Sequence, residues 1–340
     1  MNSANTRPLP DPEISLRDAR DFIIGSNLAR RAFASSQPAI TLFLHDLLDV
    51  VYRLVQSCHL PEFTDYGLPH LCSLVDRVSR WDISTGATAS SSLLADSLEP
   101  DEATTLLIAL LIHDLGMLSH NPVDLPTNAT QLQSKAQWSD IANWVRHTHV
   151  SRWEKLVLRV MPRSEHEGFL KSDLFSRAIE VAKSHQQWPW EWSGAWSADP
   201  RLRGLAAVVA VTDLLDEDSA RCDTTTLLEH REGNLLNRAH WLRHALTDNR
   251  VLVVGCKIEV TMVKPPNTGS ILRPLYSALR NHFRLVMLYD KELNSIGAPI
   301  TNIELAPSTG TPSLINPGLA EWNMISGLAS HLCRGQAGPI

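Results

Sequence analysis

Two adjacent residues, His113 and Asp114, lie inside the most apolar run of the chain, LIALLIHDLGML. A second histidine–aspartate pair, His45–Asp46, occurs in the apolar stretch FLHDLLDV. An isolated carboxylate or imidazolium is costly to bury, so such groups are neutralised, paired or bound to a metal. At most one of the two pairs is needed for chemistry, and residues elsewhere in the chain indicate which.

The helical phase of other histidines and acids identifies further candidates. In the helix expected to begin at Ser139, His149 lies within the apolar face, whereas His147 points nearly opposite. The segment LFSRAIEVAKSHQQ places His185 in line with its apolar stripe. In LRGLAAVVAVTDLLDEDSAR the stripe continues with Asp213, a carboxylate where a leucine would be expected.

With an earlier histidine, these side chains form an ordered set of imidazoles and carboxylates on five predicted segments. The set is His70, His113, Asp114, His149, His185 and Asp213. Such ligands suit iron, manganese, zinc or related divalent ions. A bundle of facing helices can direct all of them to one point. The alternative is that they are ordinary core side chains with satisfied hydrogen bonds.

The order of this set resembles that of the HD-domain metal-dependent phosphohydrolases. The two histidines between the doublet and the last aspartate are similar to the binuclear branch of that superfamily. The local sequences that carry the resemblance are FTDYGLPHLCSLV, LLIHDLGM, WVRHTHVSRW, VAKSH and VTDLLDEDSAR. It covers roughly residues 62–225, with weaker support to 305. LLDEDSAR followed by a β-containing tail is similar to bacterial HD proteins with a C-terminal extension.

The resemblance implies a mostly α fold, an HD-type helical bundle, that holds two divalent cations. Mn, Fe, Zn, Mg, Ni and Co are not distinguished. One ion would be held by His70, His113 and Asp213, and the other by His149 and His185. Asp114 and a hydroxide would bridge the two ions, which makes His113 and Asp114 the expected catalytic residues. In the family that the sequence resembles, a histidine on an earlier helix precedes the metal-binding doublet. His45 is the first histidine of the chain, so His45–Asp46 is expected to lie outside the site.

The expected activity is phosphoester hydrolysis in a nucleotide, cyclic nucleotide or short oligonucleotide. Met117 stands where the HD-GYP branch usually carries lysine, and HQQWPWEW lacks that branch's second adjacent histidine and Gly-Tyr-Pro element. Hydrolysis of cyclic di-GMP is therefore not expected. Two alternatives stay open: an HD module that senses a nucleotide without turnover, and a di-iron oxygenase of the same superfamily.

Two features near the set have more than one interpretation. The tryptophan-rich segment WPWEWSGAW at 188–196 could cover the site and stack on a base, or serve tertiary packing or a subunit contact. Asp216 and Glu217 could bind a ligand histidine or Arg221, or form a solvated helix end. Lys183, Arg146 and Arg203 could hold a phosphate or be ordinary surface charges.

The pattern along the chain predicts a helical body followed by a smaller mixed unit. Helix starts are indicated at Pro100, Ser139, Ser172–Asp173 and Asp199–Pro200. VLVVGCKIEVTMV and ITNIEL read as strands around a helix at 271–289. We expect four segments: a flexible leader at 1–15, a helical metal-binding domain at 16–247, an α+β extension at 248–310 and a tail at 311–340.

Composition limits the partners and the compartment. A net charge of −6 gives no general attraction for nucleic acid or acidic membranes. The expected partner is a small phosphate-bearing substrate, with no broad nucleic-acid surface and no membrane, while a homo-oligomer stays possible. The five scattered cysteines suit reduced thiols rather than disulfides or a thiolate zinc site. No span or export signal is visible in the sequence, so a cytoplasmic location is expected.

Overall fold

The computed structural model describes residues 14–35, 38–57, 67–84, 92–117, 144–152, 161, 163–216, 244, 247, 251–262 and 279–307. These residues are mostly helical and include one small three-stranded sheet, which confirms the predicted fold class. Residues 1–13 of the leader, the tail at 311–340 and part of the helix expected at 271–289 lie outside the described ranges. Among the described helices, none is long and apolar enough to cross a membrane.

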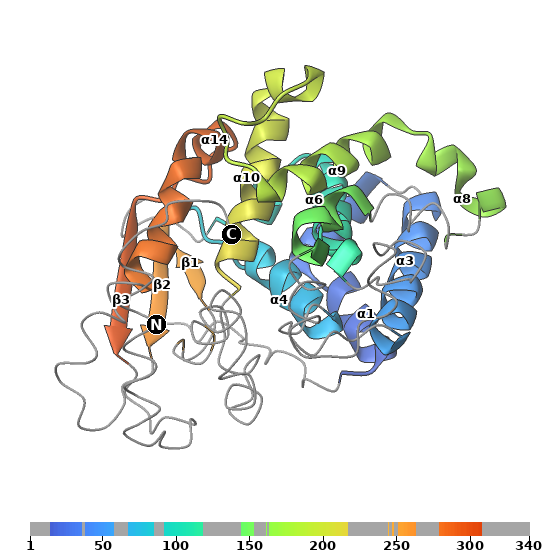
Figure 1. Ribbon diagram of the computed structural model, residues 1–340, viewed down its shortest axis with the longest axis horizontal. Helices are drawn as coiled ribbons and strands as arrows, with labels where there is room; N and C mark the ends of the chain where they lie inside the picture. Colours follow the sequence, from blue (N-terminus) through green and yellow to red (C-terminus); the bar gives the residue numbers. More distant parts are fainter. Residues whose placement is uncertain are drawn as a thin grey trace.

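Helices build the body of the molecule (Figure 1). The α-helices are α1 (Leu16–Ile24), α2 (Asn27–Ala32), α3 (Pro38–Ser57), α4 (Leu68–Ser79), α5 (Leu94–Ser97), α6 (Pro100–Ile112), a helix at 144–152, α8 (Arg163–Leu170), α9 (Asp173–Lys183), α10 (Pro200–Leu214), a helical segment at 279–284 and α14 (Asp290–Ser295). The short 3-10 helices are η1 (Phe33–Ser35), η2 (Leu115–Met117), η4 (Ser184–Gln186), η5 (Ala195–Ala198) and η8 (Leu285–Tyr289).

Three of the predicted helix starts are confirmed, and each has a visible cap. Helix α6 begins at Pro100 with a capping box between Glu99 and Glu102. The Ser172 hydroxyl accepts a hydrogen bond from the Phe175 amide at the start of α9. The Asp199 carboxylate caps α10 in the same way. The start expected at Ser139 lies outside the described residues.

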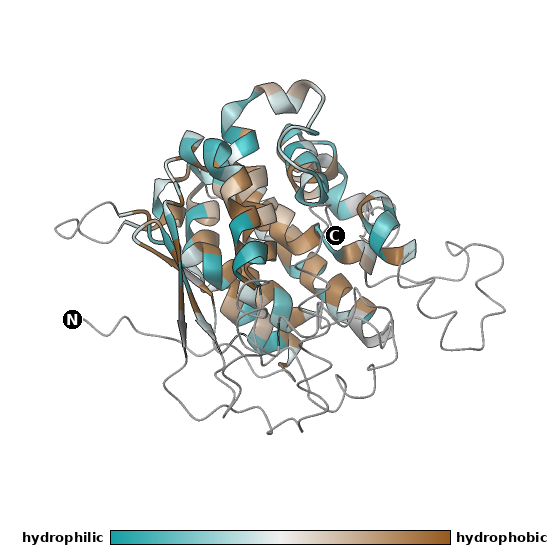
Figure 2. Ribbon diagram, turned by 60° about the vertical axis from the view of Figure 1, so that its left-hand side comes forward, coloured by the Kyte–Doolittle hydropathy of each residue, from teal (hydrophilic) through white to brown (hydrophobic). Residues whose placement is uncertain are grey.

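Helices α6 and α10 form the centre of the core. Helix α6 is buried continuously from Ala103 to Ile112, and α10 from Gly204 to Thr212. A helix that is apolar on all sides belongs in the interior, and Figure 2 shows the hydrophobic residues, in brown, concentrated on helices in the middle of the molecule. Around them pack α2, α4 and α9. The Arg201 guanidinium joins the starts of both helices by binding the two Glu102 oxygens at 2.6 Å.

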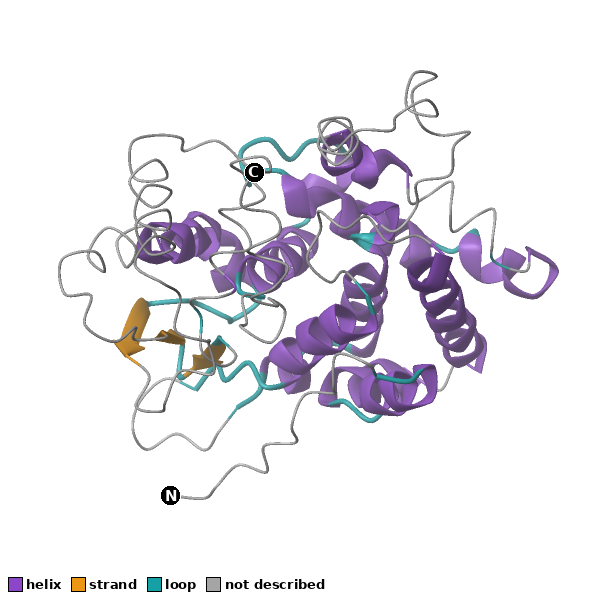
Figure 3. Cartoon of the chain, turned by 60° about the horizontal axis from the view of Figure 1, so that its bottom comes forward, coloured by secondary structure: helices purple, strands orange, loops and turns teal. Residues whose placement is uncertain are grey.

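The sheet lies at one edge of the helical body (Figure 3). Its order is β1 (Leu252–Val254), β2 (Lys257–Met262) and β3 (Asn302–Pro307), with β1 antiparallel and β3 parallel to β2. Alternate residues such as Ile258 and Val260 are buried, as expected for a sheet covered on one face. The sheet is hydrogen-bonded to the body, because the Asp82 amide donates to the Val253 carbonyl at 3.0 Å.

Helix α14 packs directly on α10 at Gly204. A Cβ atom at this position would lie 2.3 Å from Ile296 Cγ2 and 3.1 Å from the Glu292 carbonyl oxygen. The contact between the two helices therefore depends on the missing side chain. It brings the C-terminal elements against the helix that carries Asp213.

We predict that Gly204→Ala destabilises the protein by about 1–3 kcal/mol, because the new methyl group overpacks the contact with α14. Gly168→Ala in α8 is the matched control, since nothing lies within 4 Å of its Cβ position. The control should raise stability by roughly 0.5–1 kcal/mol through helix propensity. Urea unfolding of both variants measures the difference, and equal stabilisation by the two alanines would contradict the close contact.

Candidate metal centre

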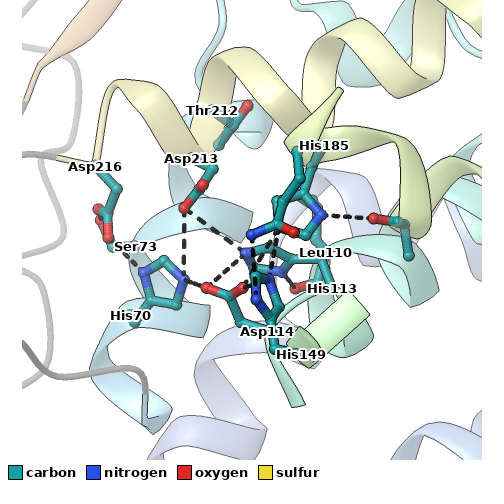
Figure 4. Close-up of polar contacts among 12 residues, drawn as sticks. His70, Ser73, Leu110, His113, Asp114, His149, His185, Thr212, Asp213 and Asp216 are labelled. Atoms are coloured by element: carbon teal, nitrogen blue, oxygen red, sulfur yellow. Dashed lines mark hydrogen bonds and ion pairs between the residues drawn. The ribbon is translucent and has the colours of Figure 1, made fainter. Parts of the chain in front are cut away.

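The structure brings all six predicted side chains together in the interior (Figure 4). They come from α4, the end of α6, the helix at 144–152, η4 and α10: His70, His113 and Asp114, His149, His185, and Asp213. The side chains of the first five are at most 7% exposed, whereas that of Asp213 is 34% exposed. The cluster is therefore dry except on the side of Asp213.

The Asp114 carboxylate lies at the middle of the cluster. Its Oδ2 atom is 3.3 Å from His113 Nε2 and 3.7 Å from His70 Nε2. Its Oδ1 atom is 3.1 Å from His149 Nε2 and 3.5 Å from His185 Nε2. Each oxygen thus faces a different pair of imidazoles.

Asp213 completes the first of these two groups. Its Oδ1 atom lies 3.7 Å from His113 Nε2 and 4.0 Å from His70 Nε2. The ligand atoms form one group of four residues and one group of three, and Asp114 is common to both. Each group has its potential ligand atoms within 4.8 Å of one another, which is compatible with metal binding.

The other ring nitrogen of three histidines is fixed by a backbone carbonyl. Nδ1 of His113 lies 2.9 Å from the Leu110 oxygen, while Nδ1 of His149 and of His185 each lie 2.7 Å from the carbonyl three residues earlier. A carbonyl only accepts hydrogen bonds, so Nδ1 must carry the proton. In the neutral imidazole, Nε2 then presents a lone pair to the centre.

These lone pairs test whether the residues fit a metal. His149 Nε2 and His185 Nε2 are only 3.2 Å apart, and both face a carboxylate oxygen. His113 Nε2 is buried and makes no hydrogen bond within the described part of the chain. Lone pairs and carboxylates that converge in a dry site repel one another unless positive charge lies between them. The donor set therefore fits divalent cations, whose preferred ligands include imidazole and carboxylate.

His70 is oriented by a carboxylate instead of a carbonyl. Its Nδ1 atom lies 2.5 Å from Asp216 Oδ2, and the Asp216 side chain is fully buried. Asp216 also accepts hydrogen bonds from Ser73 Oγ at 2.5 Å and Arg77 Nη1 at 3.1 Å. Of the two interpretations of Asp216, the structure supports the contact to a ligand histidine. Ser73 and Arg77 were not among the predicted residues, although their spacing of three and seven residues from His70 places them on one helical face.

Gly116, two residues after the doublet, brings two parts of the centre together. A Cβ atom at this position would lie 2.1 Å from the backbone oxygen of His149. The Gly116 carbonyl accepts a hydrogen bond from Arg152 Nη2 at 2.9 Å. The glycine of HDLG therefore lets the backbone of the helix at 144–152 approach the doublet. This role of Gly116 was not predicted from the sequence.

The carboxylates and imidazoles shift one another's pKa. Burial disfavours the charged form of His113, but Asp114 and Asp213 outweigh burial and hold its pKa well above the ordinary value. Burial likewise opposes ionisation of Asp114, yet His113, His149 and His185 hold its pKa well below the usual range. Burial lowers the pKa of His149. Without a metal, a proton on His113 supplies part of the positive charge that the site requires.

The tryptophan-rich segment packs beside the centre. The Trp192 side chain is buried, its Nε1 donates to the Ser184 and Gln187 carbonyls, and the Arg203 guanidinium lies 5.1 Å from its ring centroid. Tertiary packing is thus the role that the structure shows for Trp192. Arg203 also pairs with Glu292, which supports a structural role over phosphate binding.

The second doublet lies apart from the six residues. Asp46 Oδ2 is 2.7 Å from His166 Nε2, so this aspartate pairs with a histidine of α8. Neither His45 nor Asp46 belongs to the two groups around Asp114. The contrast between His147, which is exposed, and His149, which is buried, confirms the helical phase argument.

The raised pKa of His113 predicts a pH dependence of stability in the metal-free protein. Because the folded-state pKa lies above the ordinary 6.5, the charged His113 stabilises the fold fully below that pH. This contribution is lost as pH rises through the folded-state pKa. The lowered pKa of Asp114, Asp213 and His149 affects stability only at lower pH. Urea unfolding in chelator should therefore give a falling free energy of unfolding above about pH 6.5.

Added Zn²⁺ or Mn²⁺ should reverse this trend, because a metal ligand must be deprotonated. We expect the stabilisation caused by the metal to grow with pH over the same interval. His113→Gln is the comparison variant, since it carries no titrating group at this position. A wild-type stability in chelator that stays constant above pH 6.5 would contradict the His113 assignment.

Comparison with known proteins identifies the family of the chain. The family model described as HD-CE matches residues 60–284, about two thirds of the chain, and the match includes all six residues of the cluster. No curated protein and no solved structure matches the chain. The chain therefore belongs to the HD-CE family.

Proposed function

We propose that this protein is a metal-dependent phosphohydrolase that cleaves a phosphoester bond in a nucleotide, a cyclic nucleotide or a short oligonucleotide. The observation that carries the proposal is the arrangement around Asp114, whose two oxygens face two separate pairs of Nε2 atoms. Family membership supports the same reaction class, because the sequence resembles HD-domain phosphohydrolases.

The donor set suits two divalent cations that share Asp114. His70, His113 and Asp213 would hold one, and His149 and His185 the other. Mixed imidazole and carboxylate ligands suit manganese, iron and zinc. The group of Asp114, His149 and His185 has one protein ligand fewer than the other group. This leaves room for water and substrate oxygens.

The residues of the chain prepare this site for hydrolysis in three ways. The three carbonyl contacts and Asp216 direct every Nε2 to the centre. Burial excludes bulk water and strengthens each electrostatic interaction with a phosphoryl group. The partial exposure of Asp213 indicates the side from which substrate enters. Bound divalent cations activate water and offset the charge that develops on phosphoryl oxygens.

Aromatic residues support a nucleotide as the substrate. Trp190 is 66% exposed and stacks on Trp188 with ring centroids 5.6 Å apart. Trp188 contacts Tyr289, whose pKa is raised by burial and by the nearby charge of Asp213. Tyr289 donates a hydrogen bond to the carbonyl of Gln187, two residues after His185, so the aromatic residues connect this part of the chain with the exposed Trp190. Stacking of a base on an aromatic ring contributes about 1–3 kcal/mol.

We predict that Asp114→Asn lowers metal-dependent hydrolysis by on the order of 10²-fold or more, because the shared ligand is weakened and loses its charge. Asp46→Asn is the matched control: it changes the second histidine–aspartate doublet and keeps an oxygen for the bond to His166. The control should keep wild-type activity. The assay is a panel of phosphate monoesters, cyclic nucleotides and dinucleotides with added Mn²⁺, together with metal content by mass spectrometry.

Two outcomes would contradict the proposal directly, and a third would indicate a different reaction. One is undiminished hydrolysis by Asp114→Asn. The other is saturable nucleotide binding without any product by the metal-loaded wild type, which would indicate a sensing module. Oxygen consumption with a mixed-valent iron signal would instead indicate oxygenase chemistry.

A further inference from the structure

Arg77 is a guanidinium in the protein interior, only 2% exposed, on the same helix as His70. A buried cation is unfavourable unless it is paired and hydrogen-bonded. Arg77 Nη1 lies 3.1 Å from Asp216 Oδ1 and 3.4 Å from the Thr212 carbonyl oxygen. Arg77 Nε donates to the carbonyl of Val251 at 2.9 Å.

These contacts join three parts of the fold at one point. His70, Ser73 and Arg77 form one face of α4, and all three reach the carboxylate of Asp216 just after α10 (Figure 4 shows His70, Ser73 and Asp216). Val251 immediately precedes β1 and is buried. Arg77 is thus in direct contact with both the carboxylate that orients His70 and the backbone that leads into the sheet.

We propose that Arg77 is a positioning residue that holds Asp216, and through it His70, and thereby links metal binding to the order of the C-terminal sheet. The inference rests on the metal centre of the proposed function and is independent of the reaction. The contact of this unit with the cluster is between Asp216 and His70 Nδ1, on the side of the ring away from Nε2.

The planar shape of the guanidinium explains why arginine is required. Its Nε and Nη1 atoms donate in two directions, to Val251 and to Asp216. The ammonium of lysine is a single point charge on a flexible chain and cannot reproduce this pair of contacts. Lysine at position 77 would keep the charge and lose the geometry.

The linkage must be reciprocal. If the position of Val251 affects metal affinity through Arg77, then metal binding must stabilise the segment around Val251 by the same factor. Val253, two residues further along in β1, accepts a hydrogen bond from the Asp82 amide of the helical body. A change at Arg77 is therefore expected to appear in β1 and β2 before it appears elsewhere in the sheet.

The first test is metal affinity without substrate. Titration calorimetry with Zn²⁺ or Mn²⁺ should show binding about 10–100-fold weaker in Arg77→Lys than in wild type, the loss typical for partners of metal-ligating histidines. Arg80→Lys is the matched control, because Arg80 is the C-cap of the same helix and pairs with Asp76. Its affinity should equal that of wild type. Wild-type affinity in folded Arg77→Lys would overturn the proposal.

A double variant shows whether the two residues act as one unit. Asp216→Asn should weaken metal binding to a similar extent, and Arg77→Lys combined with Asp216→Asn should add little further loss. If the loss of metal affinity in the double variant equals the product of the two single losses, Arg77 acts independently of Asp216. If Arg77→Lys does not fold, Ser73→Ala removes one hydrogen bond to Asp216 and should weaken binding by about 2–10-fold; unchanged affinity would then overturn the proposal.

The second test uses hydrogen exchange in the sheet, which a merely structural role would not link to metal. In wild type and in Arg80→Lys, added metal should slow amide exchange at residues 251–262. In Arg77→Lys the metal should leave that exchange unchanged. Metal-independent exchange in wild type would overturn the linkage, whereas a protein that binds metal but hydrolyses nothing would contradict the proposed function alone.

Discussion

The structure depends on one electrostatic constraint, the convergence of two carboxylates and four imidazole Nε2 atoms at a place that is buried except on the side of Asp213. Such a group is stable only with positive charge at its centre, supplied by protons or by metal ions. The helices make the convergence possible because their ends lie at the cluster. His113 follows the last turn of α6, and His185 follows that of α9, so unpaired terminal carbonyls are available to hold the imidazoles.

Helical phase was sufficient to predict which side chains face the interior. His149 and Asp213 interrupt apolar stripes, and a polar group in such a position is informative because its burial requires a partner. The order of the ligands also separated His113–Asp114 from His45–Asp46, and in the structure Asp46 pairs with His166 instead. Because burial of a polar group is costly, polar residues in apolar segments were enough to predict the side chains of the centre.

The supporting residues could not be predicted in the same way. Ser73 and Arg77 contact Asp216 across more than 130 positions of sequence, and no local pattern specifies which helix will lie opposite. Gly116 is similar, because its role comes from the backbone of a helix that lies about 30 residues later. The residues that orient ligands depend on tertiary packing, whereas the ligands themselves are marked by their chemistry.

The described elements after residue 250 contact the helical body at several points. The family match continues to 284, Val251 is bonded to Arg77, and α14 packs against α10. The change from helical to β-rich composition marks a change of secondary structure. The described C-terminal elements nevertheless share the interior with the helices.

The Nδ1 contacts give the two groups around Asp114 unequal donor strength. In one group, the anionic partner of His70 makes that ring a stronger electron donor, and Asp213 adds a second negative ligand. In the other group, the Nδ1 atoms of both imidazoles donate to neutral backbone carbonyls. The His70 group therefore carries more negative charge than the group of His149 and His185, and it would hold a divalent cation more tightly.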